Sequence, residues 1–232
     1  MQDLFKAYKN IFDSSTIKSI WYLITHRKFE GLESPIKVGK ESNVFSALTK
    51  EKKRVAVKIY RISACDFFTM SKYLSMDTRF RRVERRRQVV LTWAKREFSN
   101  LLRAYKGMVN VPMPIAIRDN VIAMEFLGTG DDIPIPLPKL KDVPVTQKLC
   151  NNLIDEIKKL YEAGLVHGDL SEFNVLSDGE KCWIIDLSHG TPLISQAAND
   201  LLDRDVDKII RFFSKKGINI NKAEVLRHIK GK

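Results

Sequence analysis

The chain has 232 residues, of which 44% are hydrophobic and 29% charged, a composition typical of a globular protein that buries a sizeable core. It has no apolar run long enough to span a bilayer and no basic-then-apolar leader. Its three cysteines, Cys65, Cys150 and Cys182, are too scattered for a disulfide framework or a zinc site, so we expect core thiols in a reducing cytoplasm. The net charge of +12 is concentrated in residues 51–106, which carry +11, whereas residues 1–50 carry +3 and residues 107–232 carry −2.

The first predicted element is an amphipathic helix. Ser14, Ser15 and Thr16 are residue types that cap helices, and the apolar residues between Ile17 and Ile24 recur at helical spacing. We expect about three turns, ending near His26, with the apolar face packed in the core.

A polar hairpin loop is predicted within residues 35–47. Set against the G-x-G-x-x-G-x-V pattern of protein kinases, Gly39 matches the middle glycine and Val44 the final valine, whereas Ser42 stands at the third glycine position. The side chains of Lys40, Ser42 and Asn43 could hold phosphate oxygens where glycine-rich loops use backbone amides. The alternative is an ordinary polar hairpin.

A strand is predicted at Arg54–Tyr60, and a helix from about Gln88 to Tyr105. The strand fits the V-A-I-K pattern, whose lysine, here Lys58, reaches the α- and β-phosphates of ATP. Glu97 stands on an otherwise apolar face of the helix, where an unpaired acid is costly to bury. We therefore expect an ion pair between Lys58 and Glu97, although a glutamate at the edge of a helix face is the simpler alternative.

Between these two elements, residues 63–88 show neither helical nor strand periodicity and contain the arginine-rich block of residues 79–87. We predict a long, flexible basic insert. A concentrated basic block favours a polyanionic partner, RNA before a membrane, although charge runs are often just solvated loops.

The apolar run that ends at Glu125-Phe126-Leu127-Gly128 is similar to the hinge between kinase lobes, where the backbone of Glu125 and Leu127 would bind adenine. The Pro-rich and acidic stretch that follows is typical of a linker. We therefore expect two domains, an N-lobe of residues 1–128 and a C-lobe of residues 129–232.

The C-lobe is predicted to open with a helix from about Thr146 to Ala163 and to contain the central motif of the chain. His167-Gly-Asp169 is followed five residues later by Asn174, the layout of the H-R-D-x-x-x-x-N catalytic loop. A hairpin turn at residues 177–179 then leads to a buried strand ending in Asp186, the place where kinases carry Asp-Phe-Gly. Asn174 and Asp186 would face each other as metal ligands.

These motifs occur together in kinase order, and Gly39-Lys-Glu-Ser-Asn-Val with Asp169-Leu-Ser-Glu-Phe-Asn174 resembles the RIO family of atypical serine/threonine protein kinases, in the compact type-1 form. The resemblance covers about residues 12–217. It implies an α+β, bilobal protein-kinase-like fold, with an antiparallel-sheet N-lobe, an N-terminal helix, and a truncated, mainly helical C-lobe that lacks the peptide-docking helices.

The resemblance also implies a function. An ATP-dependent, autophosphorylating kinase and ATPase would act in maturation of the small ribosomal subunit, whose RNA and proteins would be its partners. ATP would be bound by Lys40, Ser42, Val44 and Lys58, with Glu97 orienting the lysine; Mg²⁺ or Mn²⁺ would be held by Asn174 and Asp186. Asp169 would act as the general base, and Asp186 as the acceptor of a transient aspartyl phosphate.

Two other interpretations remain open. Small-molecule phosphotransferases of the aminoglycoside or choline kinase type also use His-Gly-Asp-x-x-x-x-Asn, although they usually add an acid-rich helical extension. A catalytically inert RNA-binding module would keep the basic block but no ATP chemistry. Gly168 in place of the catalytic-loop arginine also argues against control by a phosphorylated activation loop.

Overall fold

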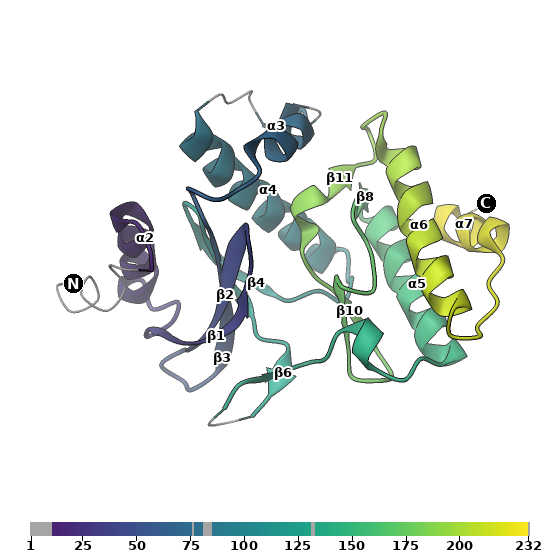
Figure 1. The fold of residues 1–232 in the computed structure, drawn as a ribbon, viewed down its shortest axis with the longest axis horizontal. Helices are drawn as coiled ribbons and strands as arrows, with labels where there is room; N and C mark the ends of the chain where they lie inside the picture. Colours follow the sequence, from purple (N-terminus) through teal and green to yellow (C-terminus); the bar gives the residue numbers. More distant parts are fainter. Residues whose placement is uncertain (1–10, 76, 81–84, 131–132, 232) are drawn as a thin grey trace. The chain divides into compact units, whose positions relative to one another are not determined.

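The computed structural model describes residues 11–75, 77–80, 85–130 and 133–231 (Figure 1). The chain forms two units. Unit 1 comprises Met1–Phe98 and Met113–Pro136, and unit 2 comprises Ser99–Pro112 and Leu137–Lys232.

Unit 1 is built on an antiparallel five-stranded sheet with the order β1-β2-β3-β5-β4. Its strands are β1 (Leu32–Val38), β2 (Ser42–Leu48), β3 (Arg54–Tyr60), β4 (Pro114–Arg118) and β5 (Val121–Glu125). The β1–β2 hairpin and β3 lie where the sequence predicts them. Successive side chains of a strand point to opposite faces, so β3 divides its residues between two cores.

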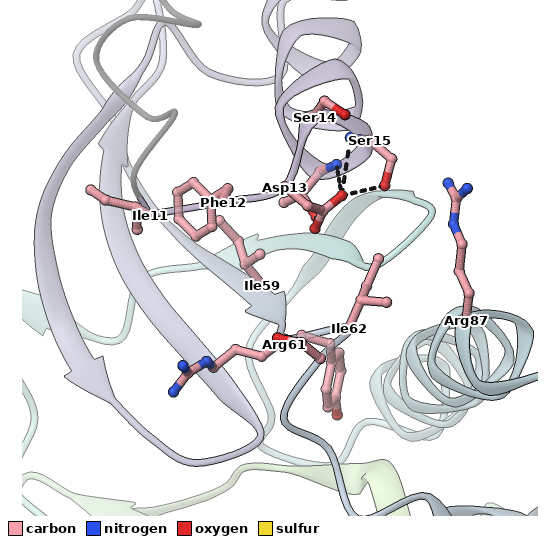
Figure 2. A pocket seen from close by; sticks show the side chains of 12 residues that line it. Ile11, Phe12, Asp13, Ser14, Ser15, Ile59, Arg61, Ile62 and Arg87 are labelled. Atoms are coloured by element: carbon pink, nitrogen blue, oxygen red, sulfur yellow. Dashed lines mark hydrogen bonds between the residues drawn. The ribbon is translucent and has the colours of Figure 1, made fainter.

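One core lies between the sheet and α2 (Ser14–Thr25), where Ile20 and Leu23 pack against Val57 and Ile59. The helix begins at Ser14, because its N-cap is Asp13, one residue before the predicted cap residues. Its carboxylate accepts hydrogen bonds from the backbone N–H groups of Ser15 and Thr16 (Figure 2).

The other core lies between the opposite face of the sheet and α4 (Arg86–Lys106), where Trp93 and Ala94 pack with Tyr60 and Ile122. Within residues 63–88, where the sequence shows no clear period, the structure has the helix α3 (Phe67–Ser75), which buries Met70 and Leu74 in this same core. Residue 76 and residues 81–84 of the insert lie outside the described part of the chain.

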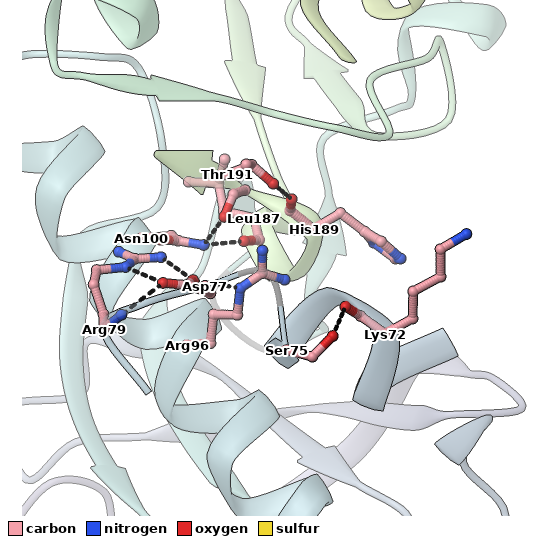
Figure 3. Close-up of polar contacts among 10 residues, drawn as sticks. Lys72, Ser75, Asp77, Arg79, Arg96, Asn100, Leu187, His189 and Thr191 are labelled. Carbon is pink, nitrogen blue, oxygen red and sulfur yellow. Dashed lines mark hydrogen bonds and ion pairs between the residues drawn. The ribbon is translucent and has the colours of Figure 1, made fainter. Parts of the chain in front are cut away.

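A buried ion pair fixes the described part of the insert that follows α3. Asp77 Oδ2 lies 2.9 Å from Nε of Arg96 on α4, and both side chains are only 1% exposed. Arg79 also pairs with Asp77, at 2.6 Å (Figure 3). An uncompensated charge is too costly to bury, so the insert and α4 depend on each other here.

Unit 2 is mainly helical, with two-stranded ladders. Its elements are η1 (Leu140–Asp142), α5 (Gln147–Glu162), β8 (Leu165–Val166), β9 (Val175–Ser177), β10 (Cys182–Ile184), η2 (Leu187–His189), β11 (Thr191–Pro192), α6 (Ala198–Ser214) and α7 (Lys222–Lys230). The helix α5 lies where the sequence predicts it, and Thr146 is its N-cap. None of the helices that the structure describes is long and apolar enough to cross a membrane.

The division between the units differs from the predicted boundary at residue 128. The short strands β6 (Gly128–Thr129) and β7 (Ile135–Pro136) pair with each other, so the predicted linker stays with unit 1 as far as Pro136. In addition, Ser99–Pro112 belongs to unit 2, where the Asn100 amide donates to the carbonyls of Leu187 and Gly190 (Figure 3).

The three cysteines are buried and reduced, as the sequence predicts. Burial raises the pKa of the Cys65 and Cys182 thiols to about 12 and that of Cys150 to about 11. At neutral pH these groups are therefore protonated core side chains.

Candidate active site

The predicted phosphate loop in unit 1 is a tight turn between β1 and β2. The Gly39 N–H donates to the Ser42 carbonyl at 3.1 Å and to Asn43 Oδ1 at 3.3 Å. A Cβ on Gly39 would lie 2.8 Å from that Ser42 oxygen, so the turn requires glycine. Asn43, which the sequence suggested as a phosphate contact, instead shapes the turn from a buried position, whereas Lys40 is exposed.

The predicted ion pair of Lys58 and Glu97 is present. Lys58 Nζ lies 2.7 Å from Glu97 Oε1, with side chains only 8% and 4% exposed. Lys58 comes from β3 and Glu97 from α4, and Val44 is the cross-strand neighbour of Lys58. An ammonium held by a buried carboxylate has a fixed position, as binding of phosphates in a defined geometry requires.

The predicted adenine-binding residues end β5. The Glu125 N–H donates to the Met113 carbonyl at 2.8 Å. The backbone group of Glu125 that remains available to adenine is therefore its own carbonyl. The Glu125 carboxylate in turn accepts from the Met113 N–H at 3.0 Å. Leu127 follows, with only 9% of its surface exposed.

In unit 2, the loop between β8 and β9 carries His167, Asp169 and Asn174. Buried His167 contacts the Ile185 carbonyl through Nε2 at 3.0 Å, and its Nδ1 accepts from the Asp169 N–H at 3.3 Å. The amide of Asn174 donates to the Asp169 carbonyl at 3.0 Å. These hydrogen bonds fix the conformation of the loop.

Asp205 on α6 also binds the backbone of this loop. No role for this residue was predicted from the sequence. Its two carboxylate oxygens accept from the N–H groups of Gly168 and Leu170, at 2.8 and 2.9 Å. Asp205 is 2% exposed, and burial raises the pKa of its carboxyl even though His167 and the two N–H donors oppose the shift. The only signal in the sequence is an acid among the inward-facing residues of a predicted helix.

The Asp169 carboxylate itself is half-exposed and pairs with Lys208, at 2.7 Å between Oδ1 and Nζ. Lys208 stands one turn after Asp205, so α6 supports both the backbone of the loop and its acidic side chain. Sequence reasoning did not single out Lys208.

Asn174 and Asp186 flank the hairpin of β9 and β10. The Ile185 N–H donates to the Asn174 carbonyl at 3.0 Å, which brings the two ends of the hairpin together as the sequence predicts. Asp186 has a left-handed backbone (φ 62°, ψ 62°), and its Oδ1 accepts from Ser188 Oγ at 2.9 Å. Such a conformation is uncommon for a residue other than glycine and is concentrated at functional sites.

This pair of residues fits magnesium chemically. The side chains offer amide and carboxylate oxygens, and Mg²⁺ is usually held by one or two carboxylates together with substrate phosphates and water. No three His, Cys, Asp or Glu side chains of the described residues gather in a metal-binding group. A nucleotide-bound Mg²⁺ does not need such a group.

A cavity of about 450 Å³ lies elsewhere in unit 1, between the first turn of α2 and the segment Ile59–Ser63 (Figure 2). None of the residues predicted to bind ATP or metal lines it. The candidate site is therefore defined by its polar contacts in each unit, and not by this cavity.

Residues 43–226 match the RIO domain family. The chain is 38% identical to the RIO-type serine/threonine-protein kinase Rio1 of Haloferax volcanii, over 99% of this chain and 79% of that protein. It is also 38% identical to the Rio1 of Methanocaldococcus jannaschii, over 100% of this chain and 79% of the relative. The human serine/threonine-protein kinase RIO1 is 33% identical over 91% of this chain, which spans 38% of the human protein.

Among solved structures, the Rio2 kinase of Chaetomium thermophilum is similar in fold, with a TM-score of 0.70 and 22% identity over 91% of this chain. The same values hold for that kinase in an ADP/Mg²⁺-phosphoaspartate complex, and the chain spans 67% and 65% of the two solved chains. The similarity confirms the predicted kinase-like α+β fold.

Proposed function

Because the chain belongs to the RIO family of serine/threonine protein kinases, we propose that it hydrolyses ATP and phosphorylates itself, and that this activity serves maturation of the small ribosomal subunit. The observation that carries the proposal is the catalytic loop of unit 2. Asp205 binds the backbone N–H groups on both sides of Asp169, and the Asn174 amide donates to the Asp169 carbonyl. The β9–β10 hairpin next to this loop leads to Asp186. The family assignment also favours this interpretation over a small-molecule phosphotransferase.

Lys58 binds the α- and β-phosphates of ATP in this proposal, and Glu97 orients the lysine. Lys40 and Ser42 contact the triphosphate from the β1–β2 turn, and Val44 packs against the nucleotide. The Glu125 carbonyl and the Leu127 N–H bind adenine. Asn174 and Asp186 hold Mg²⁺, for which Mn²⁺ can substitute, and the bound ion neutralises phosphate charge.

Asp169 accepts the proton of a serine or threonine hydroxyl when the chain phosphorylates itself. In ATP hydrolysis, a carboxylate oxygen of Asp186 attacks the γ-phosphorus and ADP leaves, which gives an acyl phosphate. Water then releases inorganic phosphate and restores the carboxylate. The phosphoaspartate in the Rio2 complex supports this route.

The proposed partner is inferred from the distribution of positive charge along the chain. Residues 51–106 carry +11, and Arg85, Arg86 and Arg87 are exposed at the start of α4. A surface of this kind attracts the phosphate backbone of RNA. The small-subunit precursor, with its RNA and proteins, is the proposed partner, and the cytoplasm the proposed location.

Incubation with γ-labelled ATP, with and without small-subunit precursors, tests the proposal. We expect turnover in the wild type and a loss of at least about 100-fold in Lys58→Met and Asp169→Asn. Hydroxylamine-labile label that disappears in Asp186→Ala supports the aspartyl phosphate. Turnover that survives both Lys58→Met and Asp169→Asn would exclude this site as its source, and a wild type without turnover would favour an inert RNA-binding module.

A further inference from the structure

Tyr60 is a buried partner of the Lys58–Glu97 pair that no kinase motif of the sequence includes. Its hydroxyl donates to Glu97 Oε2 at 2.5 Å, whereas Lys58 Nζ donates to Oε1 at 2.7 Å. Counted over the whole residue, Tyr60 is 2% exposed, Lys58 6% and Glu97 3%. The two oxygens of the carboxylate are thus bound by two different residues of one strand.

The pleat of β3 explains this arrangement. Lys58 and Tyr60 are two residues apart, so both side chains leave the sheet on the face that α4 covers. The Lys58 ammonium also lies 5.0 Å from the centre of the Tyr60 ring. Tyr60 therefore contacts both members of the ion pair, through its hydroxyl and through its ring.

A single ion pair leaves a buried carboxylate free to rotate about its last bond and to present either oxygen. A second donor on Oε2 removes that freedom, and a hydrogen bond to a charged acceptor is among the strong ones. We propose that Tyr60 is a positioning residue, which fixes the Glu97 carboxylate and thereby the phosphate-binding ammonium of Lys58. The inference rests on the proposed role of Lys58 in binding ATP.

The backbone of Tyr60 is itself fixed. Its N–H donates to the Asn120 carbonyl at 3.0 Å, and its carbonyl accepts from Asn120 Nδ2 at 2.7 Å. The same amide nitrogen also donates to Thr16 Oγ1 on α2, at 2.9 Å. The Tyr60 hydroxyl therefore reaches Glu97 from a strand end that is held on two sides and linked to the N-terminal helix.

Tyr60→Phe tests the inference, because phenylalanine keeps the ring and its packing and removes only the hydroxyl. We expect a variant that is folded at 25 °C by circular dichroism and whose kcat/KM for ATP is about tenfold lower, the size expected from one hydrogen bond to a charged group. Its Kd for Mg²⁺-ATP, measured by calorimetry, should be higher than that of the wild type. Tyr22→Phe is the matched control, since Tyr22 is 38% exposed on α2 and its loss of a hydroxyl should leave both values unchanged.

A double-mutant cycle separates positioning from a general loss of stability. If Tyr60 acts through Glu97, Tyr60→Phe should change kcat/KM less than twofold in a Glu97→Ala background, whereas an indirect effect would lower it about tenfold in both backgrounds. Equal losses in the two backgrounds, or wild-type kinetics and binding in Tyr60→Phe, would overturn the inference. Full turnover in Lys58→Met would instead contradict the proposed function, so the two failures are distinguishable.

Discussion

Gly168 occupies the position where the H-R-D loop carries arginine, and its φ of +80° lies in the left-handed region. A Cβ at this position would lie 2.7 Å from the His189 carbonyl oxygen. Any other residue must therefore displace backbone as well as adopt a strained conformation. The glycine is required by the geometry of the loop, whose N–H at this residue binds Asp205.

Gly168→Ala should lower the free energy of unfolding by about 2–4 kcal/mol, because backbone strain and a steric clash add. Turnover of ATP should fall with it, since the loop that carries Asp169 must shift. Urea unfolding and labelled-ATP hydrolysis measure the two effects. Gly217→Ala is the control: its φ is +85°, but nothing lies within 4 Å of the added Cβ, so we expect a cost of about 1 kcal/mol and normal turnover. Equal costs at the two positions would contradict the clash.

Lys208 offers a test of how Asp169 is held. The pair is half-exposed, so its removal should change the free energy of unfolding by less than about 1 kcal/mol. Lys208→Met nevertheless leaves the Asp169 carboxylate without its 2.7 Å partner, and we expect a severalfold lower kcat for autophosphorylation. Lys148→Met removes an exposed pair with Glu180 in the same unit and should leave kcat unchanged. An unaltered kcat in Lys208→Met would show that Asp169 does not depend on this contact.

At the scale of elements, the ion pair of Asp77 and Arg96 fastens the insert to α4. Asp77→Ala leaves the Arg96 guanidinium buried without its carboxylate, so we expect a loss of about 3 kcal/mol or more in urea unfolding. Glu180→Ala, which breaks a largely exposed pair with Lys148, should cost less than about 0.5 kcal/mol. Replacing both partners, as Asp77→Leu with Arg96→Met, should restore part of the stability; a double variant as unstable as Asp77→Ala would contradict this explanation.

The same pair predicts a pH dependence. Burial opposes ionisation of Asp77, but hydrogen bonds from Arg79 and Arg96 outweigh it and hold the pKa of the carboxyl below its usual value. A lowered pKa in the folded state gives stability that is present above the unfolded pKa of about 3.9 and is lost as the pH falls through the folded pKa. The difference in unfolding free energy between the wild type and Asp77→Asn should therefore be constant from pH 7 to 5 and shrink below about pH 4. A difference that grows in acid would contradict the assignment.

Elements with a strong period or motif could be predicted from the sequence. The β3 strand is a β-branched and apolar run interrupted only by Lys58, so its bounds follow from the pattern, and the kinase order of the motifs predicts the pairing of Lys58 with Glu97. The helix α3 could not be recognised as readily, because only Met70 and Leu74 are buried along it and the basic residues that follow obscure the period. Residues that support the candidate site from a distance, such as Asp205, carry no local signature, because their role depends on how α6 packs in unit 2.

At the scale of the whole molecule, charge is divided unevenly along the chain. The excess of +11 in residues 51–106 contrasts with −2 in residues 107–232, so a polyanion should be bound by a limited part of the surface. Within the described residues, Arg85, Arg86 and Arg87 form one exposed basic group, and Lys50, Lys52 and Lys53 form another at the turn between β2 and β3. The two groups carry equal charge and so provide a matched comparison.

Reversing the three arginines to glutamate should weaken binding to small-subunit precursor RNA and reduce the slope of log Kobs against log salt concentration by about 2–3, since each lost phosphate contact removes close to one unit. The same reversal of the three lysines changes the net charge equally and controls for long-range attraction. We expect it to lower affinity less and to leave most of the slope intact, as measured by filter binding between 50 and 300 mM salt. Equal effects of the two triple variants would mean that RNA responds to the total charge and not to the arginine block. An arginine variant with wild-type affinity and slope would exclude residues 85–87 from the RNA-binding surface.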